Sequence, residues 1–236
     1  DMHSMEMPES LLAIARAGAG TNNIPIKKCS EQGIVVFNTP GANANAVREL
    51  VMAALLLSTR KLYPALNWVQ SLKGEENVAA LAEKEKSTFA GPELRGKKLG
   101  VIGLGAIGIR VSNMAHSFGM DVYGYDPFLS VDAAWKVSRG IHHSESLDEI
   151  FSECDFITLH VPLTPETKDT INAESIEKMK DGVRIFNFAR AGLVNNEDLI
   201  NAIKAKKVGF YATDFAQEEL IGYPEILIFP HLGAST

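Results

Sequence analysis

The sequence has few cysteines, no long basic run and no long apolar run. Its two cysteines, Cys29 and Cys154, stand far apart without metal-site spacing, so we expect buried thiols in a reducing cytoplasm and no metal. The net charge of −6 argues against nucleic acid and anionic membranes as partners. Apolar runs such as 51–57 are too short to span a bilayer, and no signal peptide is visible at the start. We therefore expect a cytoplasmic protein.

What the sequence does contain is a regular alternation of strand-like and helix-like segments. With 236 residues, 46% of them hydrophobic, the chain can bury one large core or two smaller ones. The alternation with short connections predicts an α/β fold with a doubly wound parallel sheet. The expected strands cover 33–38, 97–102, 121–125, 155–161, 183–188, 209–213 and 226–229, and the expected helices cover 26–32, 45–68, 107–118, 146–154, 172–180 and 197–206.

A glycine-rich turn after the strand at 97–102 predicts a dinucleotide site. Gly103, Gly105 and Gly108 fit G-x-G-x-x-G, in which the glycines allow a tight turn, close approach of a pyrophosphate and close helix packing. The following helix directs free N–H groups at the phosphates. Asp126 closes the next strand, where a ribose-binding carboxylate belongs, so we expect NAD rather than NADP. The same turn and acid would also suit an S-adenosylmethionine-dependent methyltransferase.

Three other strand ends carry groups that suit one reaction. Arg190 can bind a carboxylate through paired donors, although an arginine there can also serve only a helix end or surface acids. His231 can take a proton from a hydroxyl near neutral pH. Glu218 or Glu219, in the loop between the last two strands, can hold the imidazole in one tautomer. The other histidines, including His160, are interpreted as structural.

Taken in order, these motifs resemble the D-2-hydroxyacid dehydrogenases. The resemblance covers essentially the whole chain and is strongest to the members that oxidise 3-phosphoglycerate, the first step of serine biosynthesis. It implies NAD as cofactor, a Rossmann-type nucleotide domain and a homodimer formed through that domain and the 45–68 helix. The segments that carry it are 16–23, 93–97, 101–108, 125–127, 159–164, 186–190 and 230–236.

The resemblance also implies roles for individual residues. The catalytic set is Arg190, Glu219 and His231, which orient the substrate, stabilise the imidazolium and exchange the proton. Groups beside the cofactor are expected at Gly103, Gly105, Ala106, Ile107, Gly108, Asp126, Pro162, Thr164, Ala189, Asp214 and Gly233. Substrate contacts are expected at Gly18, Ala19, Asn43 and Arg190, with backbone N–H groups holding a carboxylate.

The sequence departs from the family pattern in ways that leave the substrate open. The family's Glu-Glu-Pro is Glu218-Glu219-Leu220 here, so only spacing favours Glu219, and Ala191 replaces a glycine. The opening strands of a flavodoxin-like substrate domain are not in the sequence. We expect residues 1–43 to be the remainder of that domain, 44–232 the nucleotide domain and 233–236 the return. Glyoxylate, hydroxypyruvate or a hydrophobic 2-hydroxy acid therefore remain alternative substrates, and a dinucleotide-sensing binding protein remains an alternative function.

Overall fold

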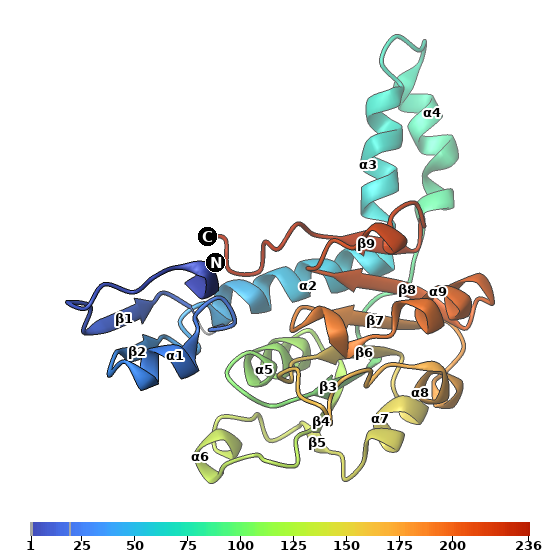
Figure 1. Ribbon diagram of the computed structural model, residues 1–236. Helices are drawn as coiled ribbons and strands as arrows, with labels where there is room; N and C mark the ends of the chain where they lie inside the picture. Colours follow the sequence, from blue (N-terminus) through green and yellow to red (C-terminus); the bar gives the residue numbers. More distant parts are fainter. Residues whose placement is uncertain (1, 19) are drawn as a thin grey trace.

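The computed structural model describes residues 2–18 and 20–236, which form one large and one small parallel sheet (Figure 1). The large sheet has the strand order β5-β4-β3-β6-β7-β8-β9, and every pairing in it is parallel. The predicted doubly wound α/β fold is confirmed. Its strands are β3 (Lys98–Ile102), β4 (Asp121–Tyr125), β5 (His142–His143), β6 (Phe156–Leu159), β7 (Val183–Asn187), β8 (Val208–Thr213) and β9 (Ile226–Ile228).

The small sheet pairs β1 (Ala13–Arg16) with β2 (Val35–Asn38), and α1 (Ile26–Glu31) packs beside it. Ile24, Cys29 and Ile34 form its own small core. Ahead of it lies a single 3-10 turn, η1 (Met2–Ser4). Among the described residues, no α-helix precedes β1, although the sequence over 9–16 is also compatible with the end of a helix followed by a strand.

Side-chain alternation along the large sheet builds a core on each face. Ile157, Ile185 and Tyr211 point to the face covered by α7 (Leu147–Glu153), α8 (Ala173–Lys178) and α9 (Asn196–Lys204). Their neighbours Phe156, Phe186 and Ala212 point to the opposite face, covered by α2 (Ala44–Arg60) and α5 (Gly108–Ser117). Each central strand is therefore buried on both sides, as a parallel sheet requires.

The prediction of one helix over 45–68 is wrong, because α2 ends at Arg60. Lys61 takes a left-handed conformation with φ 46°, and α3 (Leu62–Ser71) starts in a new direction. Proline cannot donate a backbone hydrogen bond inside a helix but is tolerated in a first turn, where no such bond is made. The break after Arg60 puts Pro64 in that first turn.

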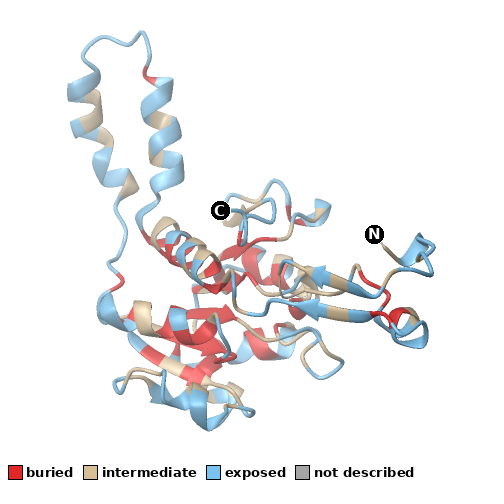
Figure 2. Cartoon of the chain, turned by 90° about the vertical axis from the view of Figure 1, so that its left-hand side faces the viewer, coloured by how far each residue is buried: buried red, intermediate tan, exposed pale blue. Residues whose placement is uncertain are grey.

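After the break, α3 and α4 (Val78–Glu85) form a hairpin that projects from the body (Figure 1). Figure 2 shows that the burial of α2 does not continue into this hairpin. Trp68 packs its ring 5.3 Å from that of Phe89, in η2 (Lys86–Phe89), at the point where the chain returns. The charged, alanine-rich sequence over 73–86, which is typical of a solvated helix or flap, thus contains the second helix of the hairpin.

Both cysteines are buried and free, as expected. Burial raises the pKa of the Cys154 thiol to about 12, so it stays protonated and unreactive at neutral pH. In the part of the chain that the structure describes, no helix is long and apolar enough to cross a membrane.

Candidate functional site

The strand order brings the expected site residues to one edge of the large sheet. All seven strands are parallel, so their carboxyl ends lie together. The chain turns outward in opposite directions from β3 and β6, and the crevice above such a switch point is where ligands bind in open α/β sheets. From β4 to β9, the loops along this edge carry Asp126, the glycine-rich turn, Pro162, Arg190, Asp214 and His231 in that order.

Each glycine of the turn meets a different steric demand. Gly103 has φ 95°, and a Cβ on it would lie 2.7 Å from the carbonyl oxygen of His160. A Cβ on Gly108 would lie 1.9 Å from the carbonyl oxygen of Gly103. Around Gly105, by contrast, nothing lies within 4 Å of a Cβ position. The turn therefore packs tightly against β6 on one side and leaves an open cradle at Gly105, which fits a pyrophosphate.

The other residues of the turn differ in their exposure. Ile107 precedes α5 and packs against the α2 face of the core, whereas Ala106 is exposed. A Cβ on Gly41 would come within 3.3 Å of the Ala106 methyl group. The turn that precedes α2 is thus in contact with the glycine-rich turn.

Asp126 lies at the end of β4 and joins its loop to the glycine-rich turn. Its Oδ2 accepts a hydrogen bond of 2.8 Å from the Leu104 N–H, and its Oδ1 accepts one of 2.9 Å from the Phe128 N–H. A carboxylate oxygen has room for a second hydrogen bond, so both oxygens can still accept from a ribose hydroxyl. The half-buried carboxylate is therefore preformed beside the cradle.

The corner after β6 is closed by a residue that the sequence did not single out. The Thr167 hydroxyl donates to the carbonyl of Pro162 at 2.6 Å and accepts from the Thr164 N–H at 2.8 Å. These bonds fix the corner as a compact turn next to the glycine loop. A threonine three residues after another threonine in a Pro-flanked loop is the signal that could have indicated it.

The turn after β7 exposes Arg190 toward the small sheet. The guanidinium Nη1 donates to the Ala189 carbonyl at 2.6 Å, and Nη2 would lie 3.6 Å from a Cβ on Gly20. The arginine thus reaches Gly20, at the end of the segment where the substrate carboxylate was expected. Among the described residues, one of its five N–H donors makes a hydrogen bond, so the guanidinium can bind an added carboxylate through the others.

Asp214, at the end of β8, is buried at 3% exposure and holds the loop that carries His231. Its Oδ1 accepts from the Leu232 N–H at 2.7 Å, and its Oδ2 accepts from the Gly233 N–H at 2.8 Å. His231 itself is exposed, with φ 59°, and its ring meets that of Phe215 edge-on at 5.4 Å. A left-handed histidine is an uncommon conformation that its surroundings must impose.

The carboxylate–imidazole pair expected between Glu219 and His231 is not formed in this structure. Glu219 lies in η4 (Glu218–Leu220), and its Oε1 accepts from the Asn196 Nδ2 at 2.9 Å, which lowers the pKa of this carboxyl group. Within residues 2–18 and 20–236, no hydrogen bond or ion pair joins Glu218 or Glu219 to His231.

The expected substrate contacts are only partly brought together. The Gly18 N–H already donates to the Thr39 hydroxyl at 2.8 Å, so it is not free to hold a carboxylate here. Asn43 is the N-cap of α2, with no side-chain capping bond, and lies next to the turn that meets Ala106. The expectation for Ala19 falls outside the described residues.

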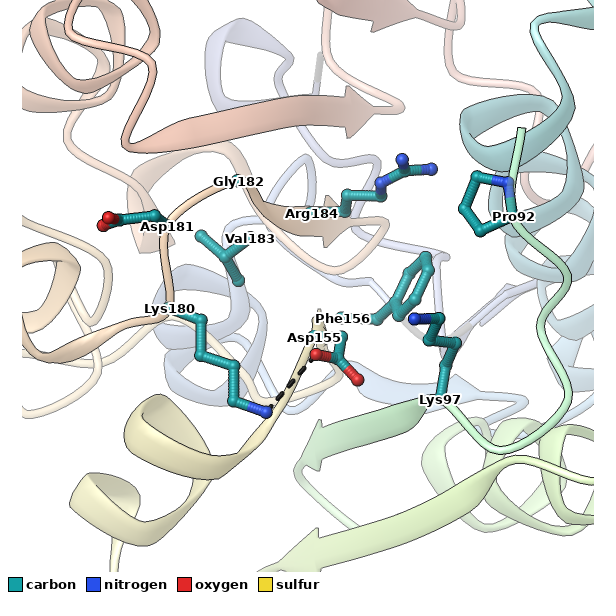
Figure 3. Close-up of a pocket in the computed structure, with 9 residues that line it drawn as sticks. All are labelled: Pro92, Lys97, Asp155, Phe156, Lys180, Asp181, Gly182, Val183 and Arg184. Atoms are coloured by element: carbon teal, nitrogen blue, oxygen red, sulfur yellow. Dashed lines mark hydrogen bonds and ion pairs between the residues drawn. The ribbon is translucent and has the colours of Figure 1, made fainter. Parts of the chain in front are cut away.

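The hollow in Figure 3 lies at the opposite, amino-terminal edge of the sheet. Most of the charged side chains that line it have partners: Lys180 pairs with Asp155 at 3.3 Å, and Arg184 donates to the Ser58 carbonyl and stands over the Phe156 ring. Asp181 points away and pairs with Lys207 at 2.9 Å. We therefore assign no ligand to it. Among the described residues, no group of three metal-binding side chains forms.

Comparison with known proteins shows which protein family this chain is similar to. The family model described as D-isomer specific 2-hydroxyacid dehydrogenase, NAD binding domain, matches residues 52–233. A D-3-phosphoglycerate dehydrogenase of Synechocystis sp. is 39% identical over 232 residues, which cover 96% of this chain and 40% of that protein. A hydroxypyruvate reductase of Thermotoga maritima is 41% identical over 98% of this chain and 74% of its own length.

Solved structures give the same assignment. The D-lactate dehydrogenase from Aquifex aeolicus, complexed with NAD and lactic acid, matches 96% of this chain and 71% of its own with a TM-score of 0.78 at 30% identity. The present chain spans about two fifths of the length of the phosphoglycerate dehydrogenases that it matches.

Proposed function

We propose, for a chain that belongs to the D-isomer specific 2-hydroxyacid dehydrogenase family and uses NAD, that it oxidises a small D-2-hydroxy acid to the 2-oxo acid. One observation carries the proposal: Arg190, His231 and the dinucleotide cradle at Gly105 lie along the same edge of one sheet. A methyltransferase would need the cradle but not the arginine and histidine.

The residues at the cradle fit a dinucleotide, which would supply the hydride acceptor when bound. We propose that Gly103, Gly105, Ala106, Ile107 and Gly108 face its pyrophosphate, because the space at Gly105 is open and α5 starts there. The remaining expected contacts would line the adenosine and nicotinamide ends, and they are Asp126, Pro162, Thr164, Ala189, Asp214 and Gly233.

In the oxidative direction, Arg190 would bind the substrate carboxylate against the 17–20 turn and Asn43. His231 would accept the proton of the C2 hydroxyl while the hydride leaves the same carbon, which turns the carbon–oxygen single bond into a carbonyl. Glu219 would then exchange Asn196 for the newly charged imidazolium, since a charge-assisted hydrogen bond is stronger than one to a neutral amide.

Replacing His231 tests this reaction. In the purified protein, His231→Asn should lower kcat by about 10²- to 10⁴-fold while the Kd of NADH stays within twofold, since the imidazole acts on the proton and not on the cofactor. Glu219→Gln should lower kcat for oxidation, because the imidazolium that forms on His231 would lose the carboxylate that stabilises it. Normal turnover by His231→Asn would reject the assignment.

Replacing Asp126 tests the cofactor preference. Asp126→Ala should raise KM for NAD and relax the rejection of NADP, because a carboxylate accepts from ribose hydroxyls and repels a 2′-phosphate. The measurement is the ratio of kcat/KM for the two cofactors. An unchanged ratio would remove Asp126 from the ribose.

For the substrate, we propose 3-phosphoglycerate, and hence a place at the start of serine biosynthesis. Phosphoglycerate dehydrogenases of several organisms are 35–40% identical over most of this chain. Hydroxypyruvate is the second candidate, because the hydroxypyruvate reductase of Thermotoga maritima is equally similar. A panel of phosphohydroxypyruvate, hydroxypyruvate and glyoxylate, reduced with NADH, separates the two; the highest kcat/KM names the substrate.

We also propose the domain division expected from the sequence: residues 1–43 as part of a substrate-binding domain, 44–232 as the NAD-binding domain and 233–236 as the return. The separate small core around Cys29 supports the first boundary. For location we propose the cytoplasm, where a reducing environment would keep both free cysteines as thiols.

A further inference from the structure

Asn187 is a fully buried polar residue at the carboxyl end of β7, three residues before Arg190. Its side chain makes three hydrogen bonds to the turn that follows. Oδ1 accepts from the Ala189 N–H at 3.2 Å and from the Arg190 N–H at 3.3 Å, and Nδ2 donates to the Arg190 carbonyl at 2.8 Å. Both backbone polar groups of Arg190 are therefore held by one side chain.

The same residue is also tied to the loop that carries His231. Its backbone carbonyl accepts from the Asp214 N–H at 3.2 Å, and the Asp214 carboxylate holds the N–H groups of Leu232 and Gly233. On its inner side the amide meets the hydroxyl of Tyr211, which is 1% exposed. Asn187 thus stands where two neighbouring strand ends and the buried core meet.

Burying the Asn187 amide costs free energy unless hydrogen bonds within the protein replace those lost to water. A buried amide is tolerated only when it is hydrogen-bonded, and an apolar residue would fill the end of a buried strand at no such cost. What the three bonds provide is a single geometry for an otherwise exposed turn. With the backbone of Arg190 fixed at both its N–H and its carbonyl, the guanidinium is directed toward Gly20.

We propose that Asn187 is a positioning residue that holds the Arg190 turn in the geometry for binding the substrate carboxylate. The proposal rests on the proposed function, in which Arg190 binds that carboxylate. Asn187 does not touch the substrate; it acts through Arg190. A displacement of about 1 Å in a positioned group can cost 10²-fold in rate, so the effect of losing these bonds should be large.

The experiment compares Asn187→Ala, Arg190→Gln and the double variant in the purified protein, with NADH and the best 2-oxo acid of the panel. Asn187→Ala should raise KM for the 2-oxo acid by roughly 10- to 100-fold with the Kd of NADH within twofold. Asn187→Ser, which keeps a hydroxyl for one of the bonds, should fall between it and the unmodified protein. In the double variant KM should be no higher than in Arg190→Gln alone, because the two residues act as one unit.

Ile185→Val is the matched control. Ile185 is fully buried on the same face of the same strand, two residues before Asn187. Its side chain forms no hydrogen bond and therefore cannot hold the Arg190 turn. Its loss of a methylene should lower the stability of the fold without changing KM. An equal rise in KM in this control would mean that loosening β7 is sufficient, and would overturn the positioning role.

The remaining outcomes separate the two proposals. If Arg190→Gln raises KM but Asn187→Ala and Asn187→Ser do not, or if the single effects multiply in the double variant, the role of Asn187 is wrong and the proposed function stands. If Arg190→Gln leaves KM unchanged, the role of Arg190 fails and that of Asn187 fails with it. If the protein reduces no 2-oxo acid, the Kd of oxalate for the NADH complex, measured by calorimetry, gives the same comparison. An equal Kd for Asn187→Ala and the unmodified protein would overturn the inference.

Discussion

At the scale of single residues, the three glycines of the glycine-rich turn meet different steric demands. A side chain on Gly108 would clash with the Gly103 carbonyl, whereas no protein atom lies within 4 Å of a Cβ on Gly105. Only the second case points to a ligand, because the open space serves no packing purpose. The distinction is invisible in G-x-G-x-x-G itself, where all three positions carry the same letter.

A pair of alanine variants makes this distinction measurable. Gly108→Ala forces the start of α5 away from β3 and should lower the free energy of unfolding by about 1–3 kcal/mol. Gly105→Ala should leave it within about 0.5 kcal/mol of the unmodified protein, yet raise the Kd of NADH at least tenfold, since the methyl group occupies the path of the pyrophosphate. Urea unfolding and fluorescence titration measure the two quantities. Unchanged NADH affinity in Gly105→Ala would contradict the cradle.

At the scale of elements, capping residues and proline decide where helices stop and start. An asparagine just before a helix-like segment predicts an N-cap. Asn172 accepts from the Ser175 N–H at 3.0 Å at the start of α8, and Asn195 accepts from the Asp198 N–H at 3.2 Å at the start of α9. Between Asn195 and Asn196 the structure chooses the first, because the second is bound to Glu219. The break at Lys61 redirects α3 into a hairpin with an exposed apolar face.

That hairpin leads us to propose the homodimer interface. Its apolar side chains Tyr63, Leu66 and Val69 are 61%, 65% and 46% exposed on a leg that projects from the body. An exposed apolar patch of this kind marks an interaction surface. The unmodified protein should elute with twice the mass of one chain, and Leu66→Glu with the mass of one, measured by light scattering. Val131→Glu, at an equally exposed apolar residue on α6 (Val131–Ala134), should leave the mass unchanged; a dimeric Leu66→Glu would contradict the interface.

At the scale of the whole molecule, the order of the strands divides the edge into a cofactor part and a chemical part. The switch between β3 and β6 places Asp126, the proposed ribose carboxylate, on one side and Arg190, Asp214 and His231 on the other. His160 lies at this switch. Its Nε2 is 2.9 Å from the Thr158 hydroxyl, its Nδ1 is buried without a partner among the described residues, and burial lowers its pKa to about 3.

The imidazole of His160 should make the stability of the fold depend on pH. The unfolded chain takes up a proton on His160 near pH 6.5, whereas the folded protein does so only near pH 3, so the stabilisation is complete above pH 6.5 and is lost as the pH falls. Between pH 7 and pH 5 the unmodified protein should lose about 2 kcal/mol more than His160→Gln. His143→Gln, at an exposed histidine, should follow the unmodified protein. Urea unfolding at several pH values checks this, and parallel pH profiles for all three would refute it.

The sequence by itself determined most of the elements of the large sheet and the chemistry that its strand ends carry. Apolar strands, cap residues and the glycine turn are local features, so their positions followed from spacing and composition, and Asp126, Arg190 and His231 were identified before the fold was known. The alternation of strands and helices also determined that these groups would lie at one edge, because parallel strands end on the same side.

Only the tertiary structure decided the contacts that cross between strands. The bonds of Asp214 to the His231 loop and of Glu219 to Asn196 join residues whose meeting depends on the path of the folded chain. The break at Lys61 is likewise seen only in the fold, where α2 packs against α5 and β7 and α3 leaves the body. Spacing along a chain fixes which groups are available, whereas packing fixes which of them meet.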